Sequence, residues 1–403
     1  MKKNMTAILS MTLFLLLLTV SVAMGMTPKE QLGKLLYFDK HLSVNNNQAC
    51  ASCHHPRSGW ADPLDAAAPD VFPISLGSVR SLNGCRNAPP SGYAAFNPVF
   101  YYDDAQQMYF GGQFWDGRAD TVMDQAKGPF TNPVEMGMPD ETAVVAALSE
   151  GNPNEAAYCI LFKEVYNVDI TTIDYTDSNL VLTVYDMVAD AIGIFEKTER
   201  LSAFTSKYDS YLAGKAQFNA QETRGLALFQ TNCSACHPSD ATVNPDGTII
   251  PPLFTDFSYD NLGVPTNNNK RLADCGIDTG LGGRLAASPD PTIFPDITLQ
   301  DGKFKVSSLR NIELTPPYAH NGYFATLLDI VHFYNTRDVA NWPPPEVLSN
   351  LNTTELGNLG LTADEEADIV AFLLTLTDGF CNKMPANFVL PDKTYWDSPL
   401  PLQ

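Results

Sequence analysis

The sequence predicts a mainly α-helical protein that consists of two tandem domains. Its 403 residues are enough for two or three domains. Helix start signals occur in both halves of the chain, whereas the alternating apolar and polar runs typical of strands are scarce. A Cys-x-x-Cys-His motif occurs once in each half, at residues 50–54 and 233–237, and a helical pattern leads into each copy. These features indicate a weak internal repeat.

Helices are predicted from capping boxes and from hydrophobic periodicity. Capping boxes, in which Thr or Asn is followed three residues later by Glu, open the segments 27–37, 219–229 and 362–376. Apolar periodicity indicates two more helices, at 141–148 and 180–196. Stretches rich in Pro, Gly, Asn and Asp at 61–97 and 238–301 are interpreted as long ordered loops. Loops of this length usually carry function, here the wrapping of a large cofactor.

The two motifs predict covalently attached haems. They comprise Cys50, Cys53 and His54 in the first half and Cys233, Cys236 and His237 in the second. Two thiols at this spacing can bond to both vinyl groups of a haem, and the adjacent His can ligate the iron. Zinc is the alternative, because Cys-x-x-Cys pairs also bind zinc. Since the chain has only six His and both motifs end in one, we expect two cytochrome-c-like domains, each wrapped around one haem c.

The N-terminus is expected to be a signal peptide, residues 1–25. Lys2 and Lys3 precede a long apolar run, and small residues at Ala23 and Gly25 suit signal peptidase. An uncleaved membrane anchor is the alternative, and either one predicts a periplasmic or exported protein. The remaining chain is divided into an N-terminal haem domain at 26–205, a C-terminal haem domain at 206–385 and a tail at 386–403.

The net charge limits the classes of molecule that the protein is expected to bind. The formal net charge of −21 argues against nucleic acid, because binding to phosphate requires clustered Lys and Arg. An acidic surface suits a basic redox protein as a binding partner.

Outside the motifs the cysteines are Cys85, Cys159, Cys275 and Cys381. They can form disulfides in any of three pairings, or remain free thiols.

Five further blocks carry a family resemblance. They read FWDGRAD at 114–120, QAKGP at 125–129, NPVEM at 132–136, SLRN at 308–311 and LTPPYAHNG at 314–322. Together with the two haem motifs, they resemble the bacterial di-haem cytochrome c peroxidases and the related MauG enzymes, in the same order and over roughly residues 27–380. The resemblance implies that the first haem, on His54, binds hydrogen peroxide and that the second, on His237, exchanges electrons with an outside partner.

The resemblance also implies roles for individual residues. Glu135 matches the distal carboxylate, which can move a proton between the two oxygens of peroxide as the O–O bond breaks. Gln125 and Pro129 match the other distal positions, and Trp115 matches an indole that relays electrons between the haems.

A calcium site is implied in the same way. Asn87 resembles the family's calcium-ligating Asn, and Thr315 and Pro317 match the backbone carbonyls that complete that site. Calcium accepts such neutral oxygens together with water.

The sequence departs from the cytochrome c peroxidases at the first haem. Those enzymes carry a switchable distal His after a motif like Ile74-Ser75-Leu76-Gly77, whereas this chain has Ser78. We therefore expect a five-coordinate first haem that is open to peroxide without prior reduction. A loop-supplied His41 or His55 is the alternative ligand.

A second departure concerns the other haem. Where the peroxidases supply a Met ligand, this chain has Tyr334, which resembles the Tyr ligand of MauG. A phenolate favours oxidised iron and lowers its potential. His332, two residues earlier, is the alternative ligand.

Three functional hypotheses follow. The first is a peroxidase that reduces hydrogen peroxide to water with electrons from a small cytochrome c or cupredoxin. The second is a MauG-like enzyme that uses peroxide to oxidise Trp or Tyr side chains of a partner protein. The third is a di-haem electron carrier, which would not need Glu135. Family members are often dimers, so the resemblance also points to a homodimer.

Overall fold

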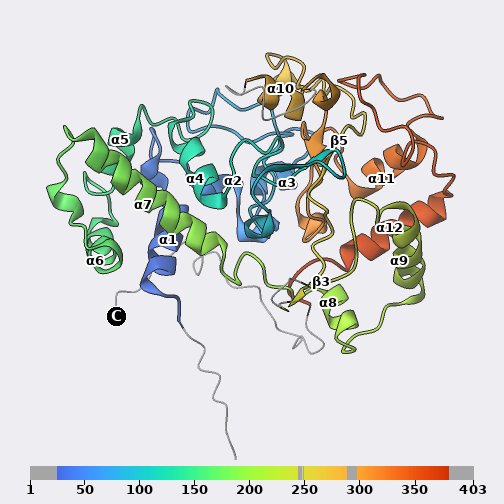
Figure 1. The fold of residues 1–403 in the computed structure, drawn as a ribbon, viewed down its shortest axis with the longest axis horizontal. Helices are drawn as coiled ribbons and strands as arrows, with labels where there is room; N and C mark the ends of the chain where they lie inside the picture. The colour runs from blue at the N-terminus through green and yellow to red at the C-terminus, as the bar shows by residue number, and fades with distance from the viewer. Residues whose placement is uncertain (1–24, 244–246, 248, 288–296, 381–403) are drawn as a thin grey trace, which may run out of the picture.

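In the computed structural model, the helices form two groups at opposite ends of the molecule, with a loop-rich region between them (Figure 1). One group contains α1 and α4–α7, and the other contains α8, α9, α11 and α12. The structure describes residues 25–243, 247, 249–287 and 297–380. The expected signal peptide, apart from Gly25, and the expected C-terminal tail lie outside these residues.

The described residues form twelve α-helices and three pairs of short antiparallel strands. The helices are α1 Pro28–Phe38, α2 Cys50–Cys53, α3 Pro63–Ala67, α4 Val122–Thr131, α5 Glu141–Ala146, α6 Glu155–Tyr166, α7 Ser178–Glu196, α8 Lys207–Leu212, α9 Ala220–Asn232, α10 Leu281–Ala286, α11 Leu327–Thr336 and α12 Ala363–Leu374. The paired strands are β1 Tyr101–Asp103 with β2 Met108–Phe110, β3 Thr242–Val243 with β4 Ile249–Ile250, and β5 Tyr259–Asp260 with β6 Phe304–Lys305. The mainly α prediction is confirmed, because the strands are only two or three residues long.

The first helix group is built on the packing of α1 against α7. Thr27 and Glu30 form the predicted capping box at the start of α1. Gly33 of α1 lies directly against the backbone of Ala191 in α7, where any side chain would collide. Among the described residues, α7 is the one helix long and apolar enough to cross a membrane. Its buried side belongs to the hydrophobic core that it forms with α1, α4 and α5.

The second helix group repeats this arrangement with α9 and α12. Both helices begin with the predicted capping boxes, at Asn219 and at Thr362. Gly225 of α9 lies against the backbone of Asp368 in α12, as Gly33 lies against Ala191. The helix that leads into each Cys-x-x-Cys-His motif therefore contacts a later helix of its own half through a glycine. This shared geometry agrees with the internal repeat indicated by the sequence.

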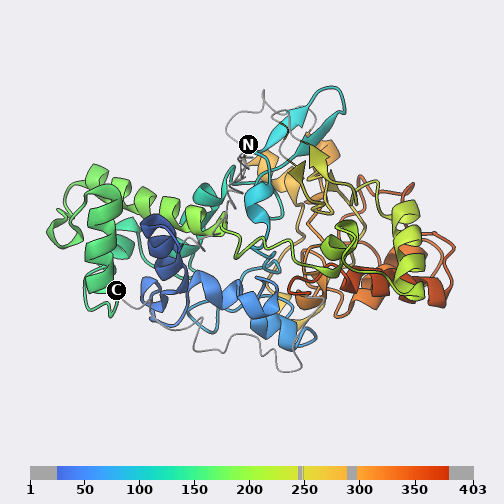
Figure 2. The same ribbon diagram turned by 90° about the horizontal axis from the view of Figure 1, so that it is seen from below.

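The two halves meet in the loop-rich middle. The β1–β2 hairpin projects between them (Figure 2) and bridges to the second half through Phe110 and Ser258. Cys85 and Cys275 form a disulfide that joins the halves. Beside it, Arg86 binds Asp278 with two hydrogen bonds of 2.6 and 2.8 Å. Of the cysteine alternatives, one pair is thus bonded, while Cys159 is a free thiol and Cys381 lies outside the described residues.

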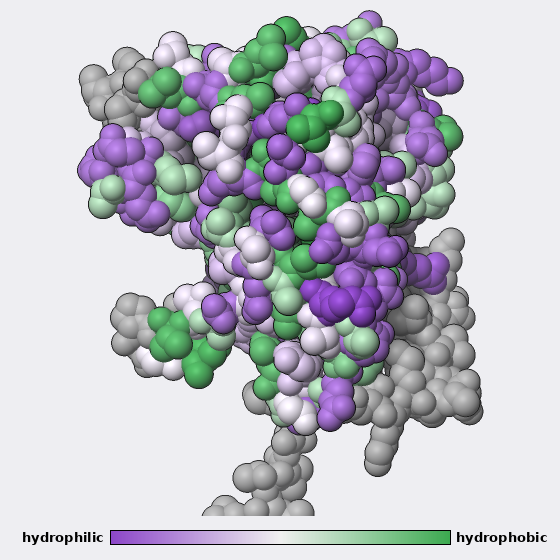
Figure 3. Space-filling model, turned by 90° about the vertical axis from the view of Figure 1, so that its right-hand side faces the viewer, coloured by the Kyte–Doolittle hydropathy of each residue, from purple (hydrophilic) through white to green (hydrophobic). Residues whose placement is uncertain are grey.

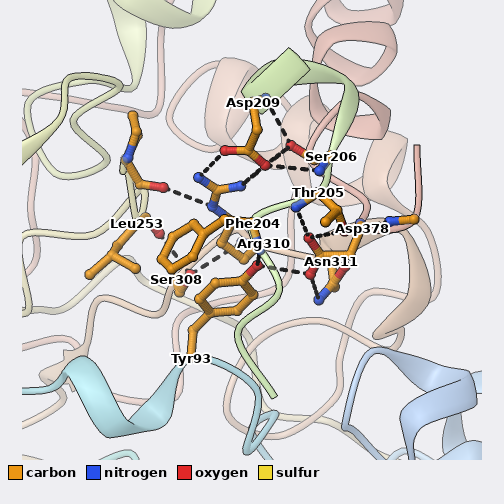
Figure 4. Close-up of polar contacts among 12 residues, drawn as sticks. Tyr93, Phe204, Thr205, Ser206, Asp209, Leu253, Ser308, Arg310, Asn311 and Asp378 are labelled. Carbon is orange, nitrogen blue, oxygen red and sulfur yellow. Dashed lines mark hydrogen bonds and ion pairs between the residues drawn. The ribbon is translucent and has the colours of Figure 1, made fainter. Parts of the chain in front are cut away.

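A second junction surrounds the buried Arg310 (Figure 4). Its guanidinium donates to both carboxylate oxygens of Asp209, at 2.7 and 2.9 Å. It also packs over the rings of Tyr93 and Phe204. The hydroxyl of Tyr93 in turn donates to Asp378 at 2.8 Å. The SLRN block of the sequence therefore supplies a structural contact between the two halves.

Candidate functional site

The first motif forms a tight turn that fixes His54. Cys50 and Cys53 lie in α2, and the backbone N–H of His54 donates to the carbonyl of Cys50 at 2.9 Å. The hydroxyl of the buried Tyr37 donates to the carbonyl of His54 at 2.9 Å. Burial lowers the pKa of the His54 imidazole. The ring is therefore held in the neutral form that a metal ligand needs.

The second motif has the same turn. The backbone N–H of His237 donates to the carbonyl of Cys233 at 2.9 Å, immediately after α9. The Nδ1 of His237 lies 2.7 Å from the carbonyl oxygen of Phe254. A carbonyl can only accept, so Nδ1 carries the proton and Nε2 keeps a free lone pair. This is the orientation in which a histidine ligates a metal through Nε2.

A deep, mostly apolar cavity opens at the second motif. Cys233, Cys236 and His237 line it, and Tyr334 of α11 lines it as well. Burial, together with the neighbouring thiols, raises the pKa of Tyr334. His332 is placed differently: its side chain is 49% exposed and its Nδ1 donates to Glu366 at 2.9 Å. Of the two alternative ligands, Tyr334 is the one that lines the cavity.

The expected distal residues come together on α4 and the turn after it. Gln125 and Pro129 lie four residues apart, on the same face of α4. Glu135 follows in the turn, and burial raises the pKa of its carboxyl group although Arg118 and Asn132 oppose the shift. The charge of Glu135 in turn contributes to the raised pKa of the Cys50 and Cys53 thiols. Glu135 therefore lies near the first motif.

Ser78, which the resemblance sets in place of a distal His, contacts the loop before the first motif. It is buried, and its hydroxyl donates to the side chain of Asn47 at 2.8 Å. The two alternative histidines are engaged in their own loops. His41 interacts with Asp39 at 3.2 Å, and Nδ1 of His55 accepts from the backbone of Arg57.

Trp115, the expected electron relay, is held by a contact with the backbone. Its ring lines the second cavity, and its Nε1 donates to the carbonyl of Asn87 at 2.8 Å. Asn87 and Pro89 line the same cavity.

The resemblance inferred from the motifs is confirmed by comparison with known proteins. Residues 27–217 match the family model described as di-haem cytochrome c peroxidase. The chain is 37% identical over 365 residues to the methylamine utilization protein MauG of Paracoccus denitrificans, covering 86% of this chain and 88% of that protein. It is 31% identical over 356 residues to cytochrome c551 peroxidase of Nitrosomonas europaea, covering 86% and 79%. The chain belongs to the di-haem cytochrome c peroxidase and MauG family.

Solved structures agree with this assignment. The diheme peroxidase BthA from Burkholderia thailandensis matches with a TM-score of 0.71 and 30% identity, over 88% of this chain and 87% of that one. A MauG-like protein associated with microbial copper homeostasis matches with a TM-score of 0.60 and 27% identity, over 88% and 90%. As a member of this family, the chain is an oxidoreductase of the peroxidase type, and the family cofactor is a pair of haems c.

Unpaired polar atoms show that the first site fits such a cofactor. Gln48 Oε1, His54 Nδ1 and Asp65 Oδ1 are buried without a hydrogen-bond partner. All three belong to the surroundings of the first motif, where the Gln48 amide also contacts the sulfur of Cys53 at 3.4 Å. Buried polar atoms are rarely left unpaired. Their concentration here, like the apolar cavity at His237, is what a protein shaped around two haems would show.

Two buried ionisable residues were missed by the sequence reading. Lys305 lines the second cavity and donates to the carbonyl of Gly112 at 2.7 Å, and burial lowers its pKa to about 7. No sequence pattern marks Lys305. Glu196 is buried at the end of α7, and burial raises its pKa to about 8. Glu196 lies on the apolar face of the helix predicted at 180–196, and this position in the sequence could have indicated that its carboxyl group is buried.

Proposed function

We propose that this protein reduces hydrogen peroxide to two water molecules at the first haem. Two electrons and two protons are needed for each peroxide. The electrons come one at a time from a small cytochrome c or cupredoxin and enter through the second haem. The observation that carries this proposal is the contact of Glu135 with Ser78: the carbonyl of the half-buried Glu135 accepts from the backbone N–H of Ser78 at 2.7 Å, so the proposed distal carboxyl group lies next to the residue that replaces an imidazole.

The chain has residues that can attach and ligate both haems. Cys50, Cys53 and His54 would attach and ligate the first, and Cys233, Cys236 and His237 the second. When bound, the haem irons supply peroxide binding and one-electron redox chemistry. The division into haem domains at 26–205 and 206–385 is supported by the two larger hydrophobic cores, one ending at Leu201 and the other starting at Tyr208, while a smaller third core joins the halves through Phe100 and Tyr259.

Glu135 is proposed to handle the proton. Its pKa is raised by burial, so the carboxyl group can hold a proton and release it again within the pocket. It would take the proton from the peroxide oxygen nearer the first haem and give it to the outer oxygen, which leaves as water. Gln125 and Pro129, on the same face of α4, would orient peroxide and limit the access of bulk water.

A second function is favoured by two observations. Tyr334 lines the cavity at His237, where we propose that it ligates the second haem, and Ser78 leaves the first haem without a switchable His. These are the features that resemble MauG. The second candidate is therefore a MauG-like reaction, in which peroxide drives the oxidation of aromatic side chains of a partner protein.

One experiment separates these possibilities. The resting ferric protein receives one equivalent of hydrogen peroxide without a donor, and then reduced cytochrome c. Immediate reaction with peroxide, followed by consumption of two cytochrome c molecules per peroxide, supports the peroxidase. Reaction with peroxide but no consumption of cytochrome c favours oxidation of a partner protein. A protein that reacts only after one haem has been reduced would contradict the open first site.

We also propose a calcium site at Asn87, Thr315 and Pro317. All three line the second cavity. Asn87 is buried, and its amide Nδ2 donates to the carbonyl of Pro73, which leaves Oδ1 for a cation. Carbonyl and amide oxygens are ligands that Ca²⁺ accepts. Removal of calcium with EGTA should slow the peroxide reaction, and added Ca²⁺ should restore it; an unchanged rate would argue against the site.

A further inference from the structure

Three aromatic rings lead from the second cavity to the protein surface. Tyr334 lines the cavity, and the ring of the preceding residue, Phe333, lies 6.0 Å from it between centroids. Phe333 is fully buried, and its ring meets that of Trp342 at 5.2 Å, almost perpendicularly. Trp342 is only partly buried. The rings thus form a continuous contact path from the proposed axial ligand to solvent.

The indole of Trp342 is held in a fixed orientation. Its Nε1 donates to the hydroxyl of Thr336 at 3.0 Å, and that hydroxyl donates to the carbonyl of His332 at 2.7 Å. The loop that carries Trp342 is fastened at its base by Arg337, which donates to the carbonyls of Leu262 and Asn352 at 3.0 and 2.6 Å. A ring that is held in one orientation moves little when an electron passes through it, so the reorganisation energy of the transfer is small.

Trp342 lies in an uncharged loop, and the nearby ring of His332, at 6.0 Å, is paired with Glu366. The loop 339–345 reads VANWPPP and carries no charge, although the chain as a whole has a net charge of −21. Val339 is 61% exposed. The end of the molecule that carries α9, α11 and α12 shows apolar side chains set among polar ones (Figure 3). A protein could therefore approach Trp342 without burying an unpaired charge.

Building on the proposed function, we propose that Trp342 is the relay residue through which electrons pass between the second haem and a small one-electron carrier protein. One electron leaves the reduced carrier, which is oxidised, and reaches the second haem, which is reduced. No bond forms or breaks and no proton moves, so the indole N–H stays bonded to Thr336.

A second aromatic path reaches the surface elsewhere and serves as the comparison. Phe254, whose carbonyl accepts from His237, contacts Tyr208 at 5.1 Å, and Tyr208 contacts the exposed Tyr211 at 6.3 Å. The surface ring of this path, Tyr211, is a phenol, which loses its proton when it is oxidised. The indole of Trp342 can lose an electron and keep its N–H, so it is the better suited of the two surface rings.

The test compares Trp342→Leu and Trp342→Phe with Tyr211→Leu as the matched control. Each holoprotein is first oxidised with one equivalent of hydrogen peroxide. It is then mixed in a stopped-flow instrument with either reduced cytochrome c or hydroquinone, a small neutral donor. The return of the haem absorption to its resting spectrum is followed over a range of donor concentrations. The spectrum and reduction potential of the second haem are measured separately, without peroxide.

Both Trp342 variants should slow the limiting rate with cytochrome c by at least about tenfold. The rate with hydroquinone, the spectrum and the potential should stay unchanged, and Tyr211→Leu should behave as the wild type. Wild-type rates with cytochrome c in Trp342→Phe would overturn the relay, as would equal slowing with both donors or slowing in Tyr211→Leu alone. If the wild type fails to turn over peroxide even with hydroquinone, the proposed function itself is wrong.

Discussion

The backbone N–H of Ser78 donates a 2.7 Å hydrogen bond to the carbonyl oxygen of Glu135. This contact ties the segment that lacks the switchable His to the segment that carries the proposed distal carboxyl group. Because the Ser78 hydroxyl is directed to Asn47, the residue has no side-chain group left to compete for the first haem. The proposed reaction can therefore start from the resting protein.

The substitution Glu135→Gln should abolish rapid reaction with peroxide. The amide keeps the size of the side chain but cannot move a proton, so we expect the rate to fall by about 10²–10⁴-fold. Stopped-flow absorption with hydrogen peroxide measures the rate, and haem staining checks that both haems remain attached. The exposed Glu150 offers the control Glu150→Gln, which should react normally. Unchanged turnover in Glu135→Gln would remove it from the mechanism.

Replacement of Tyr334 by Met should raise the reduction potential of the second haem. A thioether stabilises reduced iron relative to a phenolate. Potentiometric titration of Tyr334→Met against the wild type measures the shift. His332→Gln is the control, because the half-exposed side chain of His332 is bonded to Glu366 and does not line the cavity, so its loss should leave the potential and spectrum unchanged. A shift in His332→Gln and none in Tyr334→Met would reverse the ligand assignment.

Loss of the disulfide should destabilise the whole protein. Cys85 and Cys275 are 190 residues apart, so the bond closes a long loop in the unfolded chain. Replacing either cysteine with Ser should reduce the free energy of unfolding by about 2–5 kcal/mol. Denaturant titrations measure this change, with Cys159→Ser as a control that removes a free thiol. Equal effects of the three substitutions would argue against a special role for the bond.

The raised pKa of Glu196 should make the stability of the protein depend on pH. Burial raises its pKa from the ordinary value of 4.5 to about 8, so the folded protein keeps the proton that the unfolded chain loses. Stability therefore falls as the pH rises from about 4.5 to about 8, by up to about 1.4 kcal/mol per pH unit. The Glu196→Gln variant has no carboxyl group at this position, so its stability should not fall in this way as the pH rises. Its melting temperature should equal that of the wild type near pH 4.5 and exceed it at pH 8; a constant difference across this range would contradict the shifted pKa.

The sequence was most informative where the signal is local. Capping boxes placed the starts of α1, α9 and α12, and the spacing of two thiols and a His indicated the haem sites. Cysteine pairing could not be derived, because it depends on which loops the fold brings together. Lys305 and Trp342 were missed for the same reason, since their surroundings come from segments far away in the chain. The distal and calcium residues followed only from the family resemblance, and their roles stay predictions.

The two halves are joined at several places: by the Cys85–Cys275 bond, by the packing of Arg310 over Tyr93 and Phe204, by the hydrogen bond of Tyr93 to Asp378, and by the bridge between Phe110 and Ser258. Contacts spread along the boundary in this way oppose any swing of one half against the other. We therefore expect the separation between the two redox centres to stay nearly constant through each catalytic cycle. Electron exchange between them should then be independent of solvent viscosity, because no large movement of one half against the other has to precede it.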